Sequence, residues 1–247
     1  MGNLAWVFKM ALRDFRKNFS RLLLFVSSMV IGIAALVGIS SFGDNLKNDI
    51  EKQSKELVGA DLVLDNSKPL GSQPTDSIAV AQADEINFAS MVTFPASDES
   101  RLTQVRVLEG NFPFYGKLET IPAEAEATFR AGGRKALVEK ILMAQFNAEV
   151  GDSIKVGNVT FVIEGELQKV PGQTGITATV APAVYIPMAY AEQTGLIQFG
   201  SRLQYVRYYK LADEINPDEL VKTYEAKWDE ERVDADTVED KRRQTGR

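Results

Sequence analysis

The stretch LLLFVSSMVIGIAALVGISSF, residues 22–42, decides how the rest of this chain is organised. None of its 21 residues carries an ionisable side chain. An α-helix rises about 1.5 Å per residue, so a helix of this length matches a hydrocarbon core about 30 Å thick. Only helices and closed barrels cross that core, because it offers no water to the backbone. The stretch predicts a transmembrane helix over residues 22–43, with everything from Asp44 onward on one side of the membrane.

The charges on either side of this stretch predict its orientation. Positively charged flanks stay in the cytoplasm. Asp14 is the one acidic residue before the stretch, whereas the basic residues there are Lys9, Arg13, Arg16, Lys17 and Arg21. The residues just after Gly43 are mixed in charge. We therefore expect residues 1–21 to be cytoplasmic and residues 44–247 to lie outside.

A cleaved signal peptide is the alternative to a retained anchor. Ser41 and Gly43 place small residues at the −3 and −1 positions of a possible cleavage site. The apolar run is longer than the 7–15 residues of a signal-peptide core, and the region before it is also long. We therefore favour a retained anchor.

Two features of the N-terminal part predict contacts with lipid and with other helices. Trp6 and a set of apolar residues at helical spacing predict an amphipathic helix over residues 1–21 that lies in the cytoplasmic interface. A plain extension of the transmembrane helix is the alternative. That apolar set is Leu4, Val7, Phe8, Leu12, Phe15 and Phe19. Within the membrane segment, small residues four apart favour close packing against another helix, and they are Ser28 with Gly32 and Ala34 with Gly38.

The part after the membrane segment predicts a stalk and an α+β domain with a mixed or antiparallel sheet. A stripe of Leu46, Ile50 and Leu57 predicts a stalk helix over residues 44–59, ended by Gly59. Residues 60–247 form the predicted domain, as one unit or as two subdomains. Its expected strands are 60–64, 87–94, 102–108, 135–138, 153–156, 159–167, 183–186 and 202–211. Its expected helices are 139–146, 187–194 and 217–228, the last capped by Asn216 with Pro217 at its first position.

The irregular parts of this domain have signals of their own. Gly157-Asn158 predicts a tight hairpin turn. Residues 67–76 are expected to form a loop or a joint between subdomains. The charged run after Trp228 reads as a solvated tail.

Composition excludes several kinds of chemistry. The chain has 247 residues and a net charge of −6, but residues 1–43 carry +4, which leaves 23 basic and 33 acidic residues for the remainder. A domain this acidic is an unlikely partner for nucleic acid. Histidine and cysteine are absent, so the commonest general base, the commonest metal ligand and a disulfide framework are all missing. We expect no cofactor, no metal site and no catalytic residues.

The one stretch that approaches a nucleotide-binding loop fails on spacing. GNFPFYGK, residues 110–117, has five residues between its glycines and no hydroxyl residue after the lysine. Gly132-Gly133 precedes an expected strand instead of a helix, so it also lacks phosphate-binding geometry. The chain is therefore expected to bind, transmit or assemble, and not to be an enzyme.

Several stretches together resemble ABC transporter permeases of the MacB/FtsX type. The resemblance begins with ALRDFRKNFSRLLLFVSSMVIGIAALVGISSFGDNL, residues 11–46, and includes the hairpin GDSIKVGNVTFVIEGEL, residues 151–167. Three further stretches are closer to the YbbP-like branch: GNFPFYG (110–116), PAVYIP (182–187) and TGLIQFGSRLQY (194–205). One departure is Ala183, where that branch is expected to favour arginine.

The resemblance implies a non-catalytic permease subunit of a bacterial inner membrane, with a periplasmic domain of the MacB core type. Its implied partners are a cytoplasmic ABC ATPase, a second permease or permease half, and membrane lipid; the substrate stays open. Because no second apolar span follows, we read the chain as the N-terminal portion of a permease. A free-standing single-pass receptor or adaptor is the alternative.

The segment Gly200-Ser201-Arg202 has two readings. It precedes an expected strand, so Gly200 is expected to take a positive φ in an ordinary turn. In the functional reading, Arg202 makes a bidentate contact that holds the sheet against a neighbouring subdomain or a dimer partner, a geometry that lysine does not reproduce.

Overall fold

The computed structural model describes residues 6, 7, 10, 13, 19–169, 182–198 and 200–240. The chain divides into two compact units, Met1–Lys52 and Gln53–Arg247. Most of the amphipathic helix predicted over residues 1–21 lies outside the described residues, so that prediction is left open.

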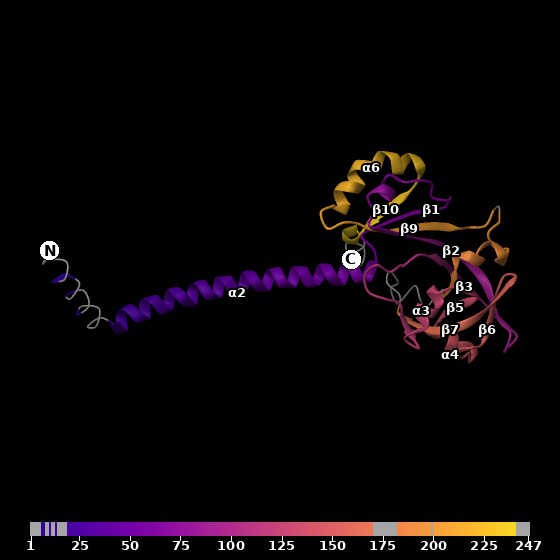
Figure 1. Ribbon diagram of the computed structural model, residues 1–247, viewed down its shortest axis with the longest axis horizontal. Helices are drawn as coiled ribbons and strands as arrows, with labels where there is room; N and C mark the ends of the chain where they lie inside the picture. Colours follow the sequence, from indigo (N-terminus) through magenta and orange to yellow (C-terminus); the bar gives the residue numbers. More distant parts are fainter. Residues whose placement is uncertain are drawn as a thin grey trace. The chain divides into compact units, whose positions relative to one another are not determined.

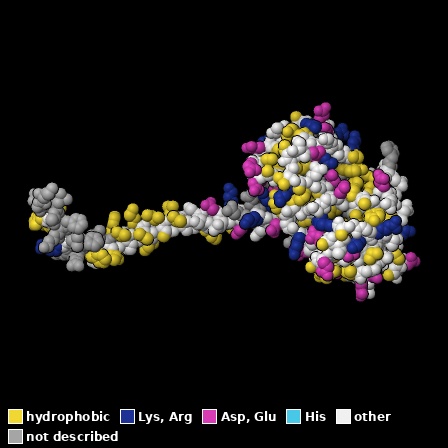
Figure 2. Space-filling model, viewed as in Figure 1, with side chains coloured by type: hydrophobic (Ala, Val, Ile, Leu, Met, Phe, Trp, Pro, Cys, Tyr) yellow, Lys and Arg dark blue, Asp and Glu magenta, His cyan; other side chains and the backbone are white. Residues whose placement is uncertain are grey.

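Helix α2 spans Phe19–Val58 and contains the apolar stretch that opens the chain. Its apolar side chains are exposed, and Figure 2 shows them gathered along the N-terminal part of the helix, with charged side chains nearer its C-terminal end. By length and composition it is the one helix among the described residues that could cross a membrane. The helix ends as predicted, because Gly59 takes a φ of +78° and its N–H donates to the Lys55 carbonyl over 2.7 Å. The division at residues 43 and 44 into membrane segment and stalk stays a prediction.

The second unit is built on one mixed sheet of ten strands (Figure 1). The strands lie in the order β10-β1-β9-β2-β3-β8-β5-β7-β4, and β6 pairs with both β2 and β7. Two of the pairings, β3 with β8 and β5 with β7, are parallel. The strands are β1 (Leu62–Asn66), β2 (Ala81–Phe94), β3 (Glu99–Glu109), β4 (Glu119–Ile121), β5 (Lys135–Glu139), β6 (Ser153–Val156), β7 (Val159–Lys169), β8 (Ala183–Pro187), β9 (Gln204–Lys210) and β10 (Asp234–Thr237). The helices of this unit are α3 (Ala125–Arg130), α4 (Lys140–Phe146) and α6 (Pro217–Glu231), with 3-10 turns at Pro74–Ser77, Met188–Tyr190 and Glu192–Thr194.

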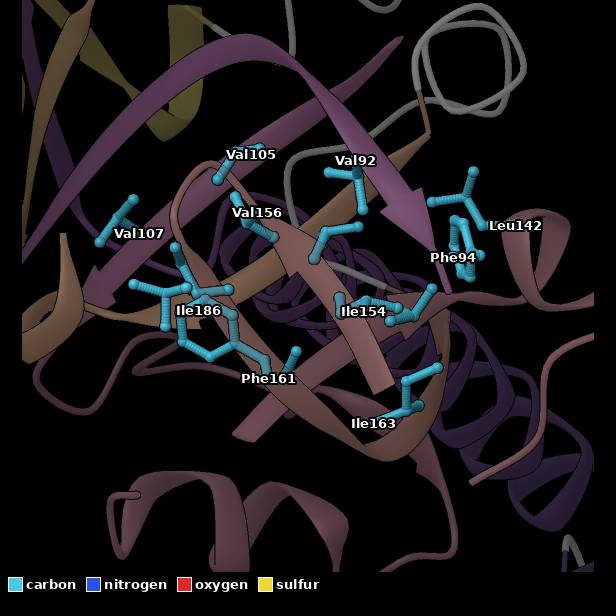
Figure 3. Close-up of a cluster of buried hydrophobic side chains, with 14 of the residues drawn as sticks. Val92, Phe94, Val105, Val107, Leu142, Ile154, Val156, Phe161, Ile163 and Ile186 are labelled. Atoms are coloured by element: carbon cyan, nitrogen blue, oxygen red, sulfur yellow. The ribbon is translucent and has the colours of Figure 1, made fainter. Parts of the chain in front are cut away.

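Strand β6 closes part of the sheet into a barrel. It pairs with the C-terminal end of β2 on one side and with β7 on the other, which completes the ring β2-β3-β8-β5-β7-β6. Closure gives each of these six strands a partner on both sides. The interior is filled by aliphatic and aromatic side chains that converge from all six strands and from α4 (Figure 3). Gly157 takes a φ of +57° in the β6–β7 turn, which confirms the hairpin predicted from Gly157-Asn158.

At the other end of the sheet, β10, β1 and β9 pack against α6 (Figure 1). Successive residues of these strands point to opposite faces, so each face receives its own buried set. Leu62 and Leu64 of β1 join Trp228 of α6 in one cluster, whereas Val63 joins a different cluster with Tyr208 of β9. Burial on both faces explains the nearly continuous apolar run over residues 60–64.

The expected α+β fold with an N-terminal helix is confirmed, and all eight expected strands are present, β6 with the expected ends and the other seven with shifted ends. The cap of α6 is also confirmed, because the Asn216 side chain accepts from the Asp218 N–H over 3.0 Å. Strand β2 begins six residues before its expected start, and α3, β4 and β10 were not expected. The expected helix over residues 187–194 is instead two 3-10 turns.

The solvated tail expected after Trp228 is wrong up to Asp240. Helix α6 continues to Glu231, and β10 pairs with β1 across the register from Leu62–Thr237 to Asp65–Asp234. In this edge strand Asp234 is exposed and Asp236 is half-buried, whereas Thr237 and the preceding Val233 are buried. The high charge of this run masked its alternation. Residues 241–247 lie outside the described part of the chain.

One prediction concerns the close approach of α3 and β7. A Cβ added at Gly165 would lie 2.4 Å from the Ala125 Cβ, and neither atom belongs to a flexible side chain. Gly165→Ala should therefore lower the free energy of unfolding by about 1–3 kcal/mol, the usual cost of overpacking. Urea unfolding of the detergent-solubilised chain, followed by the fluorescence of the buried Trp228 in a Trp6→Phe background, measures this.

The matched control removes the clashing methyl group. In an Ala125→Gly background the added cost of Gly165→Ala should be much smaller, although Ala125→Gly alone costs about 1 kcal/mol in a helix. An equal cost in both backgrounds would contradict this packing.

Candidate functional site

The last turn of α2 is fastened to the sheet through the buried carboxylate of Asp61. Lys55 Nζ lies 3.2 Å from Asp61 Oδ1, and Tyr115 Oη donates to Asp61 Oδ2 over 2.7 Å. The Leu211 N–H donates to the same oxygen over 2.9 Å. The ammonium groups of Lys55 and Lys210 also lie 5.3 and 5.5 Å from the centre of the Tyr115 ring. A single carboxylate thus ties the helix end to a loop and to the end of β9.

Gly59 allows a second contact at the same place. A Cβ there would lie 2.9 Å from Phe112 Cε2 and 2.9 Å from Pro113 Cβ, so only glycine lets the chain pass this close. The Gly59 carbonyl accepts from the Phe114 N–H over 2.7 Å. The GNFPFYG segment, which the sequence suggested as a family feature, is therefore the loop that holds the end of α2.

The Phe112 ring connects this junction to a polar cluster inside the sheet. It stacks on Tyr208 with ring centroids 3.8 Å apart. The Tyr208 hydroxyl accepts from Arg106 Nη2 over 3.1 Å. Arg106 in turn donates to both carboxylate oxygens of Glu85, over 2.7 Å from Nε and 2.9 Å from Nη2, and a further N–H contacts the hydroxyl of Tyr185. These four residues come from β2, β3, β8 and β9 and are all buried.

Electrostatics keep this cluster in one charge state. Burial alone would lower the pKa of Arg106, but the charge of Glu85, the hydroxyls of Tyr185 and Tyr208 and the hydrogen bonds to Glu85 together outweigh burial and raise that pKa. Burial and then Glu85 raise the pKa values of Tyr185 and Tyr208, against the opposing effect of Arg106. At neutral pH the guanidinium of Arg106 therefore stays charged and both hydroxyls stay protonated. The bidentate contact between Arg106 and Glu85 positions the two strands that carry them.

A second polar cluster holds the segment before β2. Arg207 Nε lies 2.6 Å from Asp84, Arg207 Nη1 lies 3.1 Å from Asp76, and Tyr209 donates to Asp76 over 2.5 Å. Burial alone would raise the pKa of Asp76, but hydrogen bonds from Tyr209 and the Gln73 backbone, together with the charge of Arg207, lower it below 3.8. The adjacent Gln73 side chain accepts from Trp228 Nε1. Residues 67–77 are therefore packed against β9 and α6.

The residues singled out from the sequence lie elsewhere. Gly200 takes a φ of +91°, as the turn reading predicts, and Ser201 Oγ donates to the Leu196 carbonyl over 2.9 Å. Arg202 is exposed and forms no ion pair with the residues that the structure describes. Ala183 is fully buried on β8. The small residues of α2, Ser28, Gly32, Ala34 and Gly38, are exposed within the single chain. Roles for these residues stay predictions.

The polar cluster was missed by sequence reasoning, although part of its signal was present. Arg106 stands between Val105 and Val107 in an expected strand, which marks a charge on a strand face. Glu85 gave no signal, because it lies in the part of β2 that was not expected to be a strand. Among the described residues there is no group of acidic, histidine or cysteine side chains that could hold a metal ion.

The buried pair yields a stability prediction. Arg106→Met and Glu85→Gln should each lower the free energy of unfolding by about 3–5 kcal/mol, because each removes one partner of a buried pair and leaves the charge of the other uncompensated. The double variant should cost clearly less than the sum of the two. Urea unfolding followed through Trp228 gives all three values, and strictly additive costs would contradict the coupling.

Comparison with known proteins shows which family this chain matches. The model of the MacB-like periplasmic core domain matches residues 22–226. An uncharacterized ABC transporter permease, YbbP of Escherichia coli (strain K12), is 27% identical over 180 residues, which are 71% of this chain and 22% of that permease. The chain therefore spans about a fifth of the length of this relative.

Two solved structures are similar at lower identity. A domain of a putative permease protein from Porphyromonas gingivalis covers 72% of this chain and 89% of its own, with 14% identity and a TM-score of 0.47. The periplasmic region of MacB from Actinobacillus actinomycetemcomitans covers 76% and 94%, with 10% identity and a TM-score of 0.45. The family match extends over most of the chain, from within α2 to within α6. The chain belongs to the family of ABC transporter permeases with a MacB-like periplasmic core domain.

Proposed function

We propose that the chain is a non-catalytic permease subunit that passes movement of the end of α2, driven by a partner ATPase, to a periplasmic domain. The observation that carries this proposal is the fastening of the last turn of α2. Lys55 and Gly59 are held by Asp61, Tyr115 and Phe112. A helix end tied by an ion pair, a backbone hydrogen bond and ring packing displaces the sheet when it moves.

The exit of the chain from the sheet supports the same proposal. Thr237 of β10 lies directly opposite Leu62 of β1, so the chain leaves the sheet beside the point where it enters. Residues 238–240 are helical. Thr237 Oγ1 donates to Asp240 Oδ2 over 2.9 Å and accepts from the Asp240 N–H, a reciprocal arrangement typical of a helix start. A force applied where β1 and β10 pair therefore acts both on the strand that enters the sheet and on the strand that leaves it.

The partners follow from the family. They are a cytoplasmic ABC ATPase, a second permease or permease half, and the lipid of the bacterial inner membrane. The domain would act by changing position, because the side chains of its two polar clusters are paired with one another and serve structure. The exported substrate is not assigned.

A disulfide across the contact between the end of α2 and the loop 110–116 tests whether this junction is stiff or acts as a hinge. A Cβ at Gly116 would lie 3.8 Å from the Glu56 Cβ, which is close to the separation in disulfides. In this cysteine-free chain, Glu56→Cys with Gly116→Cys should therefore form a bridge. If the junction already moves as one piece, the oxidised variant should stimulate the partner ATPase in proteoliposomes as strongly as the reduced one.

Each single cysteine variant controls for the strain at residue 116, where φ is +76°. Loss of stimulation on oxidation alone, restored by a reductant, would show that the junction is a hinge. If the wild-type chain does not stimulate the ATPase in any permease assembly tested, the result would instead favour a free-standing receptor.

The proposed orientation has its own test. Single cysteines at Met10 and at the exposed Val80 lie on either side of the apolar stretch. A membrane-impermeant maleimide should label Val80→Cys in spheroplasts and should label Met10→Cys only after lysis, because basic flanks stay in the cytoplasm. The reverse pattern would place the domain inside the cell.

A further inference from the structure

The outer face of β2 and β3 carries an apolar pair that nothing in the described chain covers. Met91 and Leu102 lie directly opposite each other, with 52% and 57% of their surfaces exposed. Ala89, two residues earlier on the same face of β2, is also exposed. Elsewhere in this hairpin the large apolar side chains Phe88, Val92 and Val105 point into the barrel. Met91 and Leu102 are the apolar pair of this face, and Ala89 flanks them.

Basic side chains border this pair. Lys155 of β6 lies opposite Thr93 of β2 and is exposed. Gln204 of β9 pairs with Asn87 of β2, and Leu203 packs against the same core as Phe88. Arg202, one residue earlier in the chain, therefore lies toward Ala89, two residues beyond Asn87 on β2. Leu203 packs against the barrel core, and its neighbour Arg202 is exposed.

Hydrogen bonds support the chain just before Arg202. Gln198 Nε2 donates to the Gly195 carbonyl over 2.6 Å, and Ser201 Oγ donates to the Leu196 carbonyl over 2.9 Å. A Cβ at Gly157 would lie 2.1 Å from the Thr194 carbonyl oxygen, so Thr194 lies against the β6–β7 turn. Contacts of this kind reduce the entropy that a segment loses when it binds a partner.

The charges of this border are opposite in sign to the net charge of the domain. Residues 44–247 are strongly acidic. Arg106, Arg130 and Arg207 are each paired with a carboxylate. Arg202 and Lys155 form no ion pair with the residues that the structure describes. Methionine and arginine are also among the residues enriched in protein interfaces, and apolar patches with polar borders mark such interfaces.

We propose that this face docks a segment of another protein, one that presents an apolar side chain flanked by carboxylates. The apolar side chain would cover Met91 and Leu102, and the carboxylates would pair with Arg202 and Lys155. A second copy of this chain fits less well, because the same face meeting itself would bring like charges together. The proposal does not depend on coupling to an ATPase.

Photocrosslinking of the full chain in membranes tests the proposal. Benzoylphenylalanine at Met91 or Leu102 should yield one protein adduct, and the same residue at the exposed Val80 should not. Mass spectrometry of the adduct should locate the crosslink next to Asp or Glu in a protein other than this chain. Arg202→Glu should lower the adduct yield about tenfold, since reversing a border charge opposes association. Lys222→Glu, the same charge change on the exposed side of α6, should leave the yield unchanged.

Every other outcome overturns the proposal. A crosslinked pair of this chain would assign the face to self-association, and a lipid adduct would assign it to the membrane. No adduct, or a yield that falls equally with Arg202→Glu and Lys222→Glu, would leave the pair as ordinary exposed surface. The buried Trp228 fluorescence of each variant, compared with the wild type, shows whether the domain stays folded.

Discussion

A guanidinium buried inside a protein must have its charge compensated. In this domain the compensating groups come from the strands around β3. Arg106 of β3 is matched by both oxygens of Glu85 on β2, and its remaining donors face hydroxyls from β8 and β9. Removing either partner leaves the other without compensation, so the four strands are held in one register. The barrel at one end of the sheet and the α6 layer at the other are positioned by this shared set of contacts.

The junction with α2 is built onto the same cluster. Phe112 touches Gly59 on one side and stacks on Tyr208 on the other, and Tyr208 contacts Arg106. The end of the helix is thus two side chains away from the centre of the sheet. Close packing of this kind transmits displacement, because a packed interior has little free volume to absorb it.

Sequence reasoning found the elements whose signals are local. The 21-residue apolar stretch, the Gly59 stop, the Asn216-Pro217 cap and the Gly157-Asn158 turn each depend on a few neighbouring residues. Strand β10 was missed because its charges face solvent and its pairing with β1 joins residues far apart in the sequence. The polar cluster was missed for a related reason, since Glu85, Arg106, Tyr185 and Tyr208 are neighbours only after the sheet has formed. No local pattern specifies such a site, although an arginine between two valines marks one member.

Arg106 and Arg202 differ most in how their surroundings explain them. Arg106 is buried, and its geometry is explained fully by contacts inside the domain. Arg202 is exposed and has no carboxylate partner among the described residues, in a domain where acidic side chains outnumber basic ones. Turn chemistry accounts for Gly200 and Ser201 beside it. The backbone of this motif is therefore explained by contacts inside the domain, whereas its guanidinium is free to contact a partner.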